Sequence, residues 1–206
     1  QSVEEVIQYE TPETVAAVLV ESVVGSNGLI VPPDGYMQRL REVCTRNGVL
    51  LIADEVMSGF GRTGKWFAIN HWDVVPDMIV MAKGLTSGYI PLGAIALSKK
   101  ITDVLDKQML YAGLTYNAHP LACAAAIATL RVYREDKMME NAVAMGGVIR
   151  QELEAMKAKH RSVGDARGIG LFWAIELVKD KKTREPLVKW NAMGADAVIA
   201  REINKR

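Results

Sequence analysis

Short apolar runs alternate with amphipathic stretches along the first half of the chain. Four of these runs are apolar through their length and are bounded by glycine or polar residues, which is typical of buried strands; they span residues 15–20, 49–53, 78–82 and 93–98. Residues 36–47 carry apolar positions at helical spacing, and Gly48 follows as a helix-ending signal. The alternation predicts an α/β fold with a mostly parallel sheet and helices on both faces.

The second half of the chain changes character. An alanine-rich helix is predicted from Pro120 to about Arg134, and a second helix from about Met138 to His160. A turn and a strand are expected over residues 168–178, followed by a solvated polar hairpin up to Glu185. This shift predicts a domain boundary, with residues 1–135 forming part of a large domain and residues 136–206 forming the start of a smaller α+β domain.

Both ends of the chain lie in helical patterns. The sequence opens at Gln1 without an initiator methionine and continues into a helical pattern over residues 3–7, and another such pattern covers residues 195–203. Neither pattern carries a capping glycine or proline. We therefore expect an internal piece of a longer protein, with some residues that the chemistry needs outside it.

Composition and charge exclude several classes of function. The 25 basic and 24 acidic residues leave no field that would attract nucleic acid or an anionic membrane. Charged residues interrupt every apolar run before it reaches transmembrane length. Cys44 and Cys123 are far apart in helix-like stretches, which indicates two buried thiols in a reducing, cytoplasmic compartment. The histidines lack the spacing of metal ligands; they are His71, His119 and His160.

Three polar residues follow predicted strands: Glu21, Asp54 and Lys83. The carboxyl ends of strands in such sheets face the ligand crevice. A lysine becomes a nucleophile only where burial or a nearby charge lowers its pKa, and a lone lysine at a strand end is more often a surface residue. A carboxylate held in the interior needs a partner. A pyridinium nitrogen would be such a partner for Asp54. The alternative is that the Asp54 carboxylate caps the loop that follows it.

The glycine-rich segments decide between these interpretations by resemblance. The runs IADEVMSGFGRTG, AKGLTSGYIPLGA, GLTYNAHP and RGIGL resemble the signature of class III aminotransferases; they occupy residues 52–64, 82–94, 113–120 and 167–171. The similarity extends over nearly the whole chain. It implies a pyridoxal-phosphate-dependent enzyme of fold type I.

The resemblance also implies roles for individual residues. Lys83 would hold pyridoxal 5′-phosphate as a Schiff base and move the proton between substrate and cofactor. Asp54 would pair with the pyridine nitrogen, and Val56 would pack against one face of the ring. Thr115 would donate to the cofactor phosphate from the neighbouring subunit, which implies a homodimer or larger homo-oligomer. Glu21 would line the cleft near the cofactor.

Four further residues are expected to be structural. Arg62 belongs to the loop after Asp54 that contains Gly59, Gly61 and Gly64, the glycine-rich loop. Arg167 has the chemistry of a carboxylate clamp, but the substrate-carboxylate arginine of similar enzymes lies beyond the end of this chain, so we expect Arg167 to be structural. Trp66 and Phe67 are expected in the core, with a substrate channel as the alternative.

Departures from similar enzymes narrow the substrate class. Enzymes of the ornithine, acetylornithine and GABA type carry a glutamate where Ser26 stands and a glutamine where Met57 stands. Residues 88–93 are typical of the ω-amino acid:pyruvate type. The sequence therefore predicts transfer of an amino group from an ω-amino acid or amine to pyruvate or a similar keto acid. An aminomutase or decarboxylase on the same fold, or a non-catalytic fragment, remains open, as do the donor and acceptor themselves.

Overall fold

The computed structural model describes residues 2–189, 198 and 202. The predicted C-terminal helix over residues 195–203 lies almost wholly outside the described residues. Helices (α, and η for 3-10 turns) and strands follow one another in this order: α1 (Ser2–Tyr9), η1 (Pro12–Thr14), β1 (Ala17–Glu21), α2 (Tyr36–Arg46), β2 (Leu50–Asp54), η2 (Ala68–Trp72), β3 (Met78–Met81), η3 (Lys83–Leu85), β4 (Ala94–Leu97), α3 (Lys99–Leu105), α4 (Pro120–Glu135), α5 (Met138–Lys159), β5 (Val163–Ile169), β6 (Phe172–Asp180) and β7 (Glu185–Pro186).

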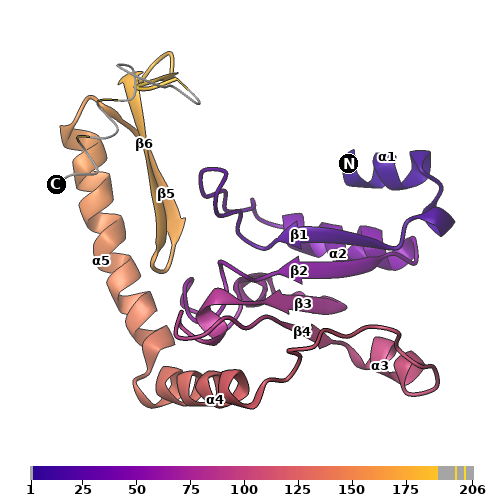
Figure 1. Cartoon of the computed structure of the whole chain (residues 1–206). Helices are drawn as coiled ribbons and strands as arrows, with labels where there is room; N and C mark the ends of the chain where they lie inside the picture. The colour runs from indigo at the N-terminus through magenta and orange to yellow at the C-terminus, as the bar shows by residue number, and fades with distance from the viewer. Residues whose placement is uncertain (1, 190–197, 199–201, 203–206) are drawn as a thin grey trace.

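The main sheet contains four strands in the order β1-β2-β3-β4 (Figure 1). The first three are parallel, and β4 pairs with β3 in antiparallel fashion at the edge. All four strands were predicted, with bounds that differ by no more than two residues. The prediction of a mostly parallel α/β sheet with helices is confirmed.

Helix α2 covers one face of this sheet. Val18 and Leu51 are register partners. Leu51 belongs to the core cluster that includes Met37 and Leu40 of α2, and Val18 packs against that cluster. Side chains on a strand alternate between faces, so Leu19 points away from α2, and 63% of it is exposed. Ile95 of β4 is 61% exposed.

A second, three-stranded sheet follows α5, in the order β5-β6-β7. The sequence predicted a single strand over residues 168–178, and the structure instead has a β5–β6 hairpin that begins at Val163. Strand β5 was missed because glycine, aspartate and arginine break its apolar pattern. Gly170 makes the tight turn with φ 59°. The predicted polar hairpin is confirmed, because β6 ends at Asp180 and pairs with β7.

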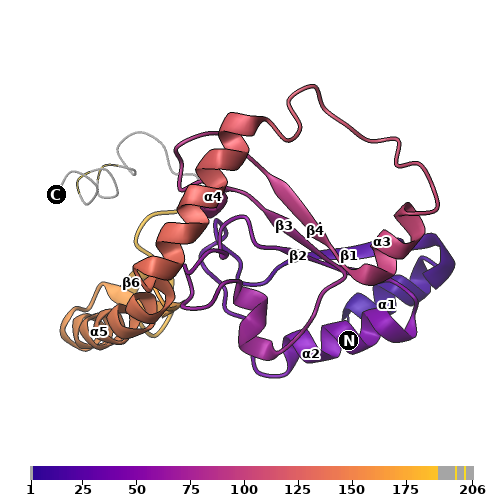
Figure 2. The same cartoon turned by 90° about the horizontal axis from the view of Figure 1, so that it is seen from below.

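The carboxyl ends of β1, β2 and β3 point toward the β5–β6 hairpin and α5 (Figure 1). Helix α4 runs beside the sheet, and α5 leads from it to the hairpin. The connection between α3 and α4 is a long loop that lies apart from the sheet (Figure 2). The α4–α5 junction at Asp136 falls where the domain boundary was predicted, and that boundary stays a prediction.

Two composition-based expectations can be compared with the described residues. Cys44 is buried and Cys123 is half-buried, and both are free thiols. Burial raises the pKa of the Cys44 thiol. Among the described residues, no helix is long and apolar enough to cross a membrane.

Candidate active site

Three predicted site residues lie at one edge of the main sheet. Glu21 and Asp54 are register partners at the carboxyl ends of β1 and β2. Asp54 is also paired with Val80 of β3, and Lys83 follows three residues later. Because parallel strands end at the same edge, residues that are 33 and 29 positions apart in sequence lie at the same edge here.

Asp54 is half-buried and oriented by its own loop. Its Oδ1 accepts a hydrogen bond of 2.9 Å from the Val56 backbone N–H, a local turn that favours one orientation of the carboxylate. Among the described residues, no hydrogen bond to Oδ2 is found. One carboxylate oxygen therefore holds the loop while the other is available to a cationic or N–H partner.

Lys83 stands at the start of η3, a single turn between β3 and the following loop. Its backbone has φ 37°, in the left-handed region that non-glycine residues rarely adopt. The side chain is exposed, and within the described part of the chain its amine makes no hydrogen bond or ion pair. No described residue therefore holds the amine in a fixed place.

Lys83 lines a cleft of about 660 Å³. Its walls come from the loops after β2 and β3, from α4 and α5, and from the start of β6. Besides Lys83, the lining residues are Met57, Gly59, Phe60, Gly61, Arg62, Gly84, Ser87, Gly88, Tyr133, Met138, Asn141, Ala142, Leu171 and Phe172. The four other predicted site residues, Glu21, Asp54, Val56 and Thr115, are not in this lining.

Glu21 has a structural contact of its own. Its Oε2 accepts a hydrogen bond of 2.9 Å from the Gly25 backbone N–H. The carboxylate thereby holds the start of the loop after β1. Glu21 stands beside Asp54 in the sheet, but its described hydrogen bond is made to its own loop.

Glu55 was not singled out in the sequence, and it is the central support of the glycine-rich loop. The side chain is fully buried. Its carboxylate accepts hydrogen bonds from the Ser58 hydroxyl at 2.6 Å and from the backbone N–H groups of Ala68 and Ile69 at 2.9 and 2.8 Å. It therefore caps η2 across 13 residues of sequence. No local pattern marks such a contact.

The β5–β6 turn packs against the glycine-rich loop. The Leu171 backbone N–H donates to the Arg62 carbonyl at 2.9 Å. A Cβ on Gly170 would collide with the backbone of Thr63. His71 Nε2 lies 3.1 Å from the Thr63 carbonyl oxygen, and burial lowers the pKa of this histidine. The loop that carries Arg62 thus contacts both η2 and the β5–β6 turn.

Arg167 makes only structural contacts in the described chain. Its Nε donates to the carbonyl groups of Gly28 and Leu29 at 2.8 and 3.0 Å. Its Nη1 donates to Glu176 at 2.7 Å and to Asp165 at 3.1 Å. These contacts tie β5 to the loop after β1 and support the expected structural role. Hydrogen bonding to Glu176 raises the pKa of Arg167.

Two residues that bear on the substrate class contact each other. The Ser26 hydroxyl lies 3.6 Å from Met57 Sδ. A Cβ added to Gly25 would lie 2.5 Å from the same sulfur and 3.4 Å from the ring of Phe172. Met57 and Phe172 line the Lys83 cleft, so the Gly25–Ser26 segment packs directly behind two of its lining residues.

Thr115 lies in the 107–119 connection between α3 and α4, where every residue is exposed. It is not among the residues that line the Lys83 cleft. Trp66 and Phe67 pack with Phe60 and Tyr133 in a core cluster, as the sequence predicted.

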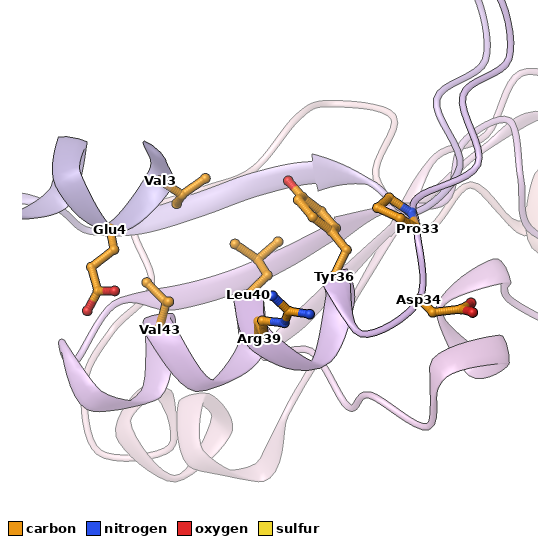
Figure 3. Close-up of a pocket in the computed structure, with 8 residues that line it drawn as sticks. All are labelled: Val3, Glu4, Pro33, Asp34, Tyr36, Arg39, Leu40 and Val43. Carbon is orange, nitrogen blue, oxygen red and sulfur yellow. The ribbon is translucent and has the colours of Figure 1, made fainter. Parts of the chain in front are cut away.

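A second pocket, of about 270 Å³, lies between α1 and α2 (Figure 3). It shares no residue with the Lys83 cleft. Its lining residues are Val3, Glu4, Pro33, Asp34, Tyr36, Arg39, Leu40 and Val43. None of them is a predicted site residue.

Comparison with known proteins identifies the family. The family model for class-III aminotransferases matches residues 1–202. Over 174 residues the chain is 45% identical to a putrescine–pyruvate aminotransferase of Pseudomonas aeruginosa. This alignment covers 84% of this chain and 38% of that protein. It is 38% identical over 195 residues to a taurine–pyruvate aminotransferase of Bilophila wadsworthia, which covers 92% of this chain and 43% of that protein.

Solved structures agree with this assignment. The taurine:2-oxoglutarate aminotransferase of Bifidobacterium kashiwanohense, in complex with PLP and glutamate, superimposes with a TM-score of 0.92 at 47% identity, over 97% of this chain and 44% of the other. An (S)-enantioselective ω-transaminase from Thermomicrobium roseum gives a TM-score of 0.85 at 42% identity, over 89% of this chain and 41% of the other. The chain spans about two fifths of the length of these relatives. It belongs to the class III aminotransferase family.

Proposed function

We propose that the protein containing this chain is a pyridoxal-phosphate-dependent aminotransferase that uses Lys83 to hold the cofactor. The observation that carries the proposal is the placement of Lys83 and Asp54 at adjacent strand ends, in a chain of this family. Bound pyridoxal phosphate would supply an electron sink for the substrate carbanion. Lys83 would attach to the cofactor and then move the proton at the substrate carbon.

The described residues fit this cofactor. Asp54 offers a half-buried carboxylate with Oδ1 fixed by Val56 N–H and Oδ2 available, which suits a protonated pyridine nitrogen. Val56 is half-buried two residues further on and would contact the ring. We assign Glu21 to the neighbourhood of the cofactor because it is the register partner of Asp54.

We further propose that Thr115 acts in the site of a second copy of the chain. The 107–119 connection exposes apolar side chains that a folded monomer rarely leaves in one segment; they are Met109, Leu110, Tyr111, Leu114 and Tyr116. A second subunit would cover them and receive Thr115 near the cofactor phosphate. The active species would then be a homodimer or a larger homo-oligomer.

Mixing two variants tests this arrangement in the full-length protein. Subunits with Lys83→Ala and Thr115→Ala are each expected to have little activity. If Thr115 serves the partner's site, each mixed dimer has one site with both defects and one site with neither. Mixed dimers are then expected to recover about half of the wild-type activity per dimer, since two independent sites contribute equally. No recovery in verified mixed dimers would place Thr115 in its own subunit's site or outside any site.

The proposed substrates are an ω-amino acid or amine as donor and pyruvate or a similar keto acid as acceptor. The Ser26 hydroxyl donates to Met57 Sδ, so neither position bears the glutamate or glutamine expected of the ornithine and GABA type, and relatives that are named pyruvate aminotransferases support the same class. The assay follows alanine formation from pyruvate with putrescine, taurine and β-alanine as separate donors, with 2-oxoglutarate as a competing acceptor. Failure to form either alanine from pyruvate or glutamate from 2-oxoglutarate with any donor would leave an aminomutase or decarboxylase as the better assignment.

Lys83→Ala tests the central role, with Lys159→Ala as a matched control because Lys159 is an exposed lysine at the end of α5. We expect Lys83→Ala to abolish transamination and the visible absorbance of bound cofactor, and the control to keep both. A Lys83→Ala variant that retained both would refute the proposal.

A further inference from the structure

Helix α4 makes a direct hydrogen bond to the turn that carries Lys83. The Tyr133 hydroxyl donates to the Gly84 carbonyl at 2.7 Å, across 49 residues of sequence. Tyr133 is 7% exposed, and it lines the same cleft as Lys83. The hydroxyl therefore holds the peptide group between Gly84 and Leu85, which is the next one after the peptide group that joins Lys83 to Gly84.

The ring of Tyr133 is held in place by other aromatic residues. It stacks on Phe60 with centroids 6.3 Å apart and planes at 24°, and it meets Trp66 edge-on at 6.3 Å. Phe60 also fills the space beside Gly84, where an added Cβ would lie 2.8 Å from Phe60 Cβ. Gly84 therefore contacts both the Phe60 side chain and the Tyr133 hydroxyl.

The turn has one hydrogen bond of ordinary length and two long ones. The Leu85 N–H donates to the Ala82 carbonyl at 2.9 Å, whereas the bonds from the Thr86 N–H to the Lys83 carbonyl and from the Ser87 N–H to the Gly84 carbonyl are 3.3 Å, which is long for such bonds. The left-handed backbone of Lys83, with φ 37°, is strained, and such strain persists only where the surroundings determine the conformation. Contacts from outside the turn therefore add to this single internal bond of ordinary length in keeping its shape.

We propose that Tyr133 is a positioning residue for Lys83: its hydroxyl holds the Gly84 carbonyl and so fixes the direction in which the Lys83 side chain enters the cleft. This inference rests on the proposed role of Lys83. A reacting amine on a long flexible side chain depends on its anchor, and a displacement of about 1 Å can cost about 100-fold in rate.

The test compares Tyr133→Phe with Thr129→Val in the full-length enzyme loaded with pyridoxal phosphate. Tyr133→Phe keeps the ring and removes only the hydroxyl. Thr129 is a matched control because it lies on the same helix, is 9% exposed and donates its hydroxyl to the Ala125 carbonyl, away from the turn. Both variants lose one buried hydroxyl, so their thermal midpoints are expected to change by similar amounts.

Two readouts separate positioning from general stability. For Tyr133→Phe we expect kcat to fall about 10- to 100-fold, with KM for donor and acceptor within about twofold, because substrate binding is untouched. We also expect faster amide hydrogen exchange in a peptide covering residues 84–87, measured by mass spectrometry. Thr129→Val is expected to leave both readouts at wild-type values.

The inference is overturned if Tyr133→Phe matches Thr129→Val in kcat or in exchange of that peptide. Lys83→Ala distinguishes failure of this inference from failure of the proposed function. Loss of activity in Lys83→Ala would support the proposed role of Lys83 even where Tyr133→Phe shows no effect. Should Tyr133→Phe fail to fold, exchange in the wild-type enzyme decides instead. Residues 84–87 are expected to exchange as slowly as the middle of α4, and exchange as fast as in solvent-exposed loops would overturn the inference.

Discussion

Glu55 offers the sharpest test of how the site is built. Its fully buried carboxylate accepts from the Ser58 hydroxyl and from two backbone N–H groups at the start of η2. It follows Asp54 directly, so the same short segment bears the proposed cofactor partner and its support. Replacing Glu55 by alanine removes all three hydrogen bonds and leaves the N–H groups of Ala68 and Ile69 facing a cavity.

The magnitude follows from these groups. A buried N–H left without a partner costs about 1–3 kcal/mol, so two of them cost about 2–6 kcal/mol. That is a large part of the roughly 5–15 kcal/mol by which a typical domain is stable. Glu55→Gln keeps one carbonyl oxygen as acceptor but turns an NH₂ group toward other donors. We therefore expect Glu55→Gln to lower the free energy of unfolding, by less than Glu55→Ala does.

Equilibrium unfolding in urea, followed by tryptophan fluorescence, measures both losses, since Trp72 lies in η2. With a slope of about 2 kcal/mol per molar urea, Glu55→Ala is expected to lower the midpoint by about 1 M or more. Glu152→Ala is the matched control, because Glu152 is exposed on α5. We expect this control to lower the free energy of unfolding by no more than about 0.5 kcal/mol. A Glu55→Ala loss no larger than that of the control would refute the reasoning.

Three further changes can be measured by the same unfolding assay. Burial works to raise the pKa of Asp77, but hydrogen bonds from the Leu51 N–H and from Arg41 hold that pKa below its usual range. Asp77 therefore stabilises the fold above the ordinary aspartate pKa of about 3.9, and the stabilisation is lost as the pH falls through the lower folded-state pKa. Asp77→Asn should destabilise the protein at pH 7 and cost progressively less below about pH 4; a pH-independent loss would contradict this account. Ser22→Ala should leave stability unchanged or raise it by up to about 1 kcal/mol, because the Ser22 hydroxyl is buried and has no partner among the described residues; a loss above that amount would indicate a partner. Gly170→Ala should cost at least about 1–2 kcal/mol, because its φ of 59° disfavours a Cβ and the loop backbone occupies the space; an unchanged urea midpoint would show that the turn can adjust.

The class of fold and the candidate chemistry were predictable from local patterns in the chain. Buried parallel strands must be apolar through their length, and amphipathic helices must show a 3.6-residue period. These local requirements made β1 to β4, α2, α4 and α5 predictable. The glycine-rich runs around Asp54 and Lys83 are similarly local, and the family comparison bears out the resemblance that they carry.

Which distant groups support one another depends on the folded chain. Strand β5 has too little apolar pattern to be predicted alone, and its pairing with β6 defines it. The carboxylate of Glu55 has backbone partners 13 and 14 residues away, and Tyr133 holds Gly84 across 49 residues. A buried polar group needs a partner, but any nearby donor or acceptor in the folded chain can be that partner. The sequence therefore places Lys83 at a strand end, and only the folded packing around it shows what fixes its direction.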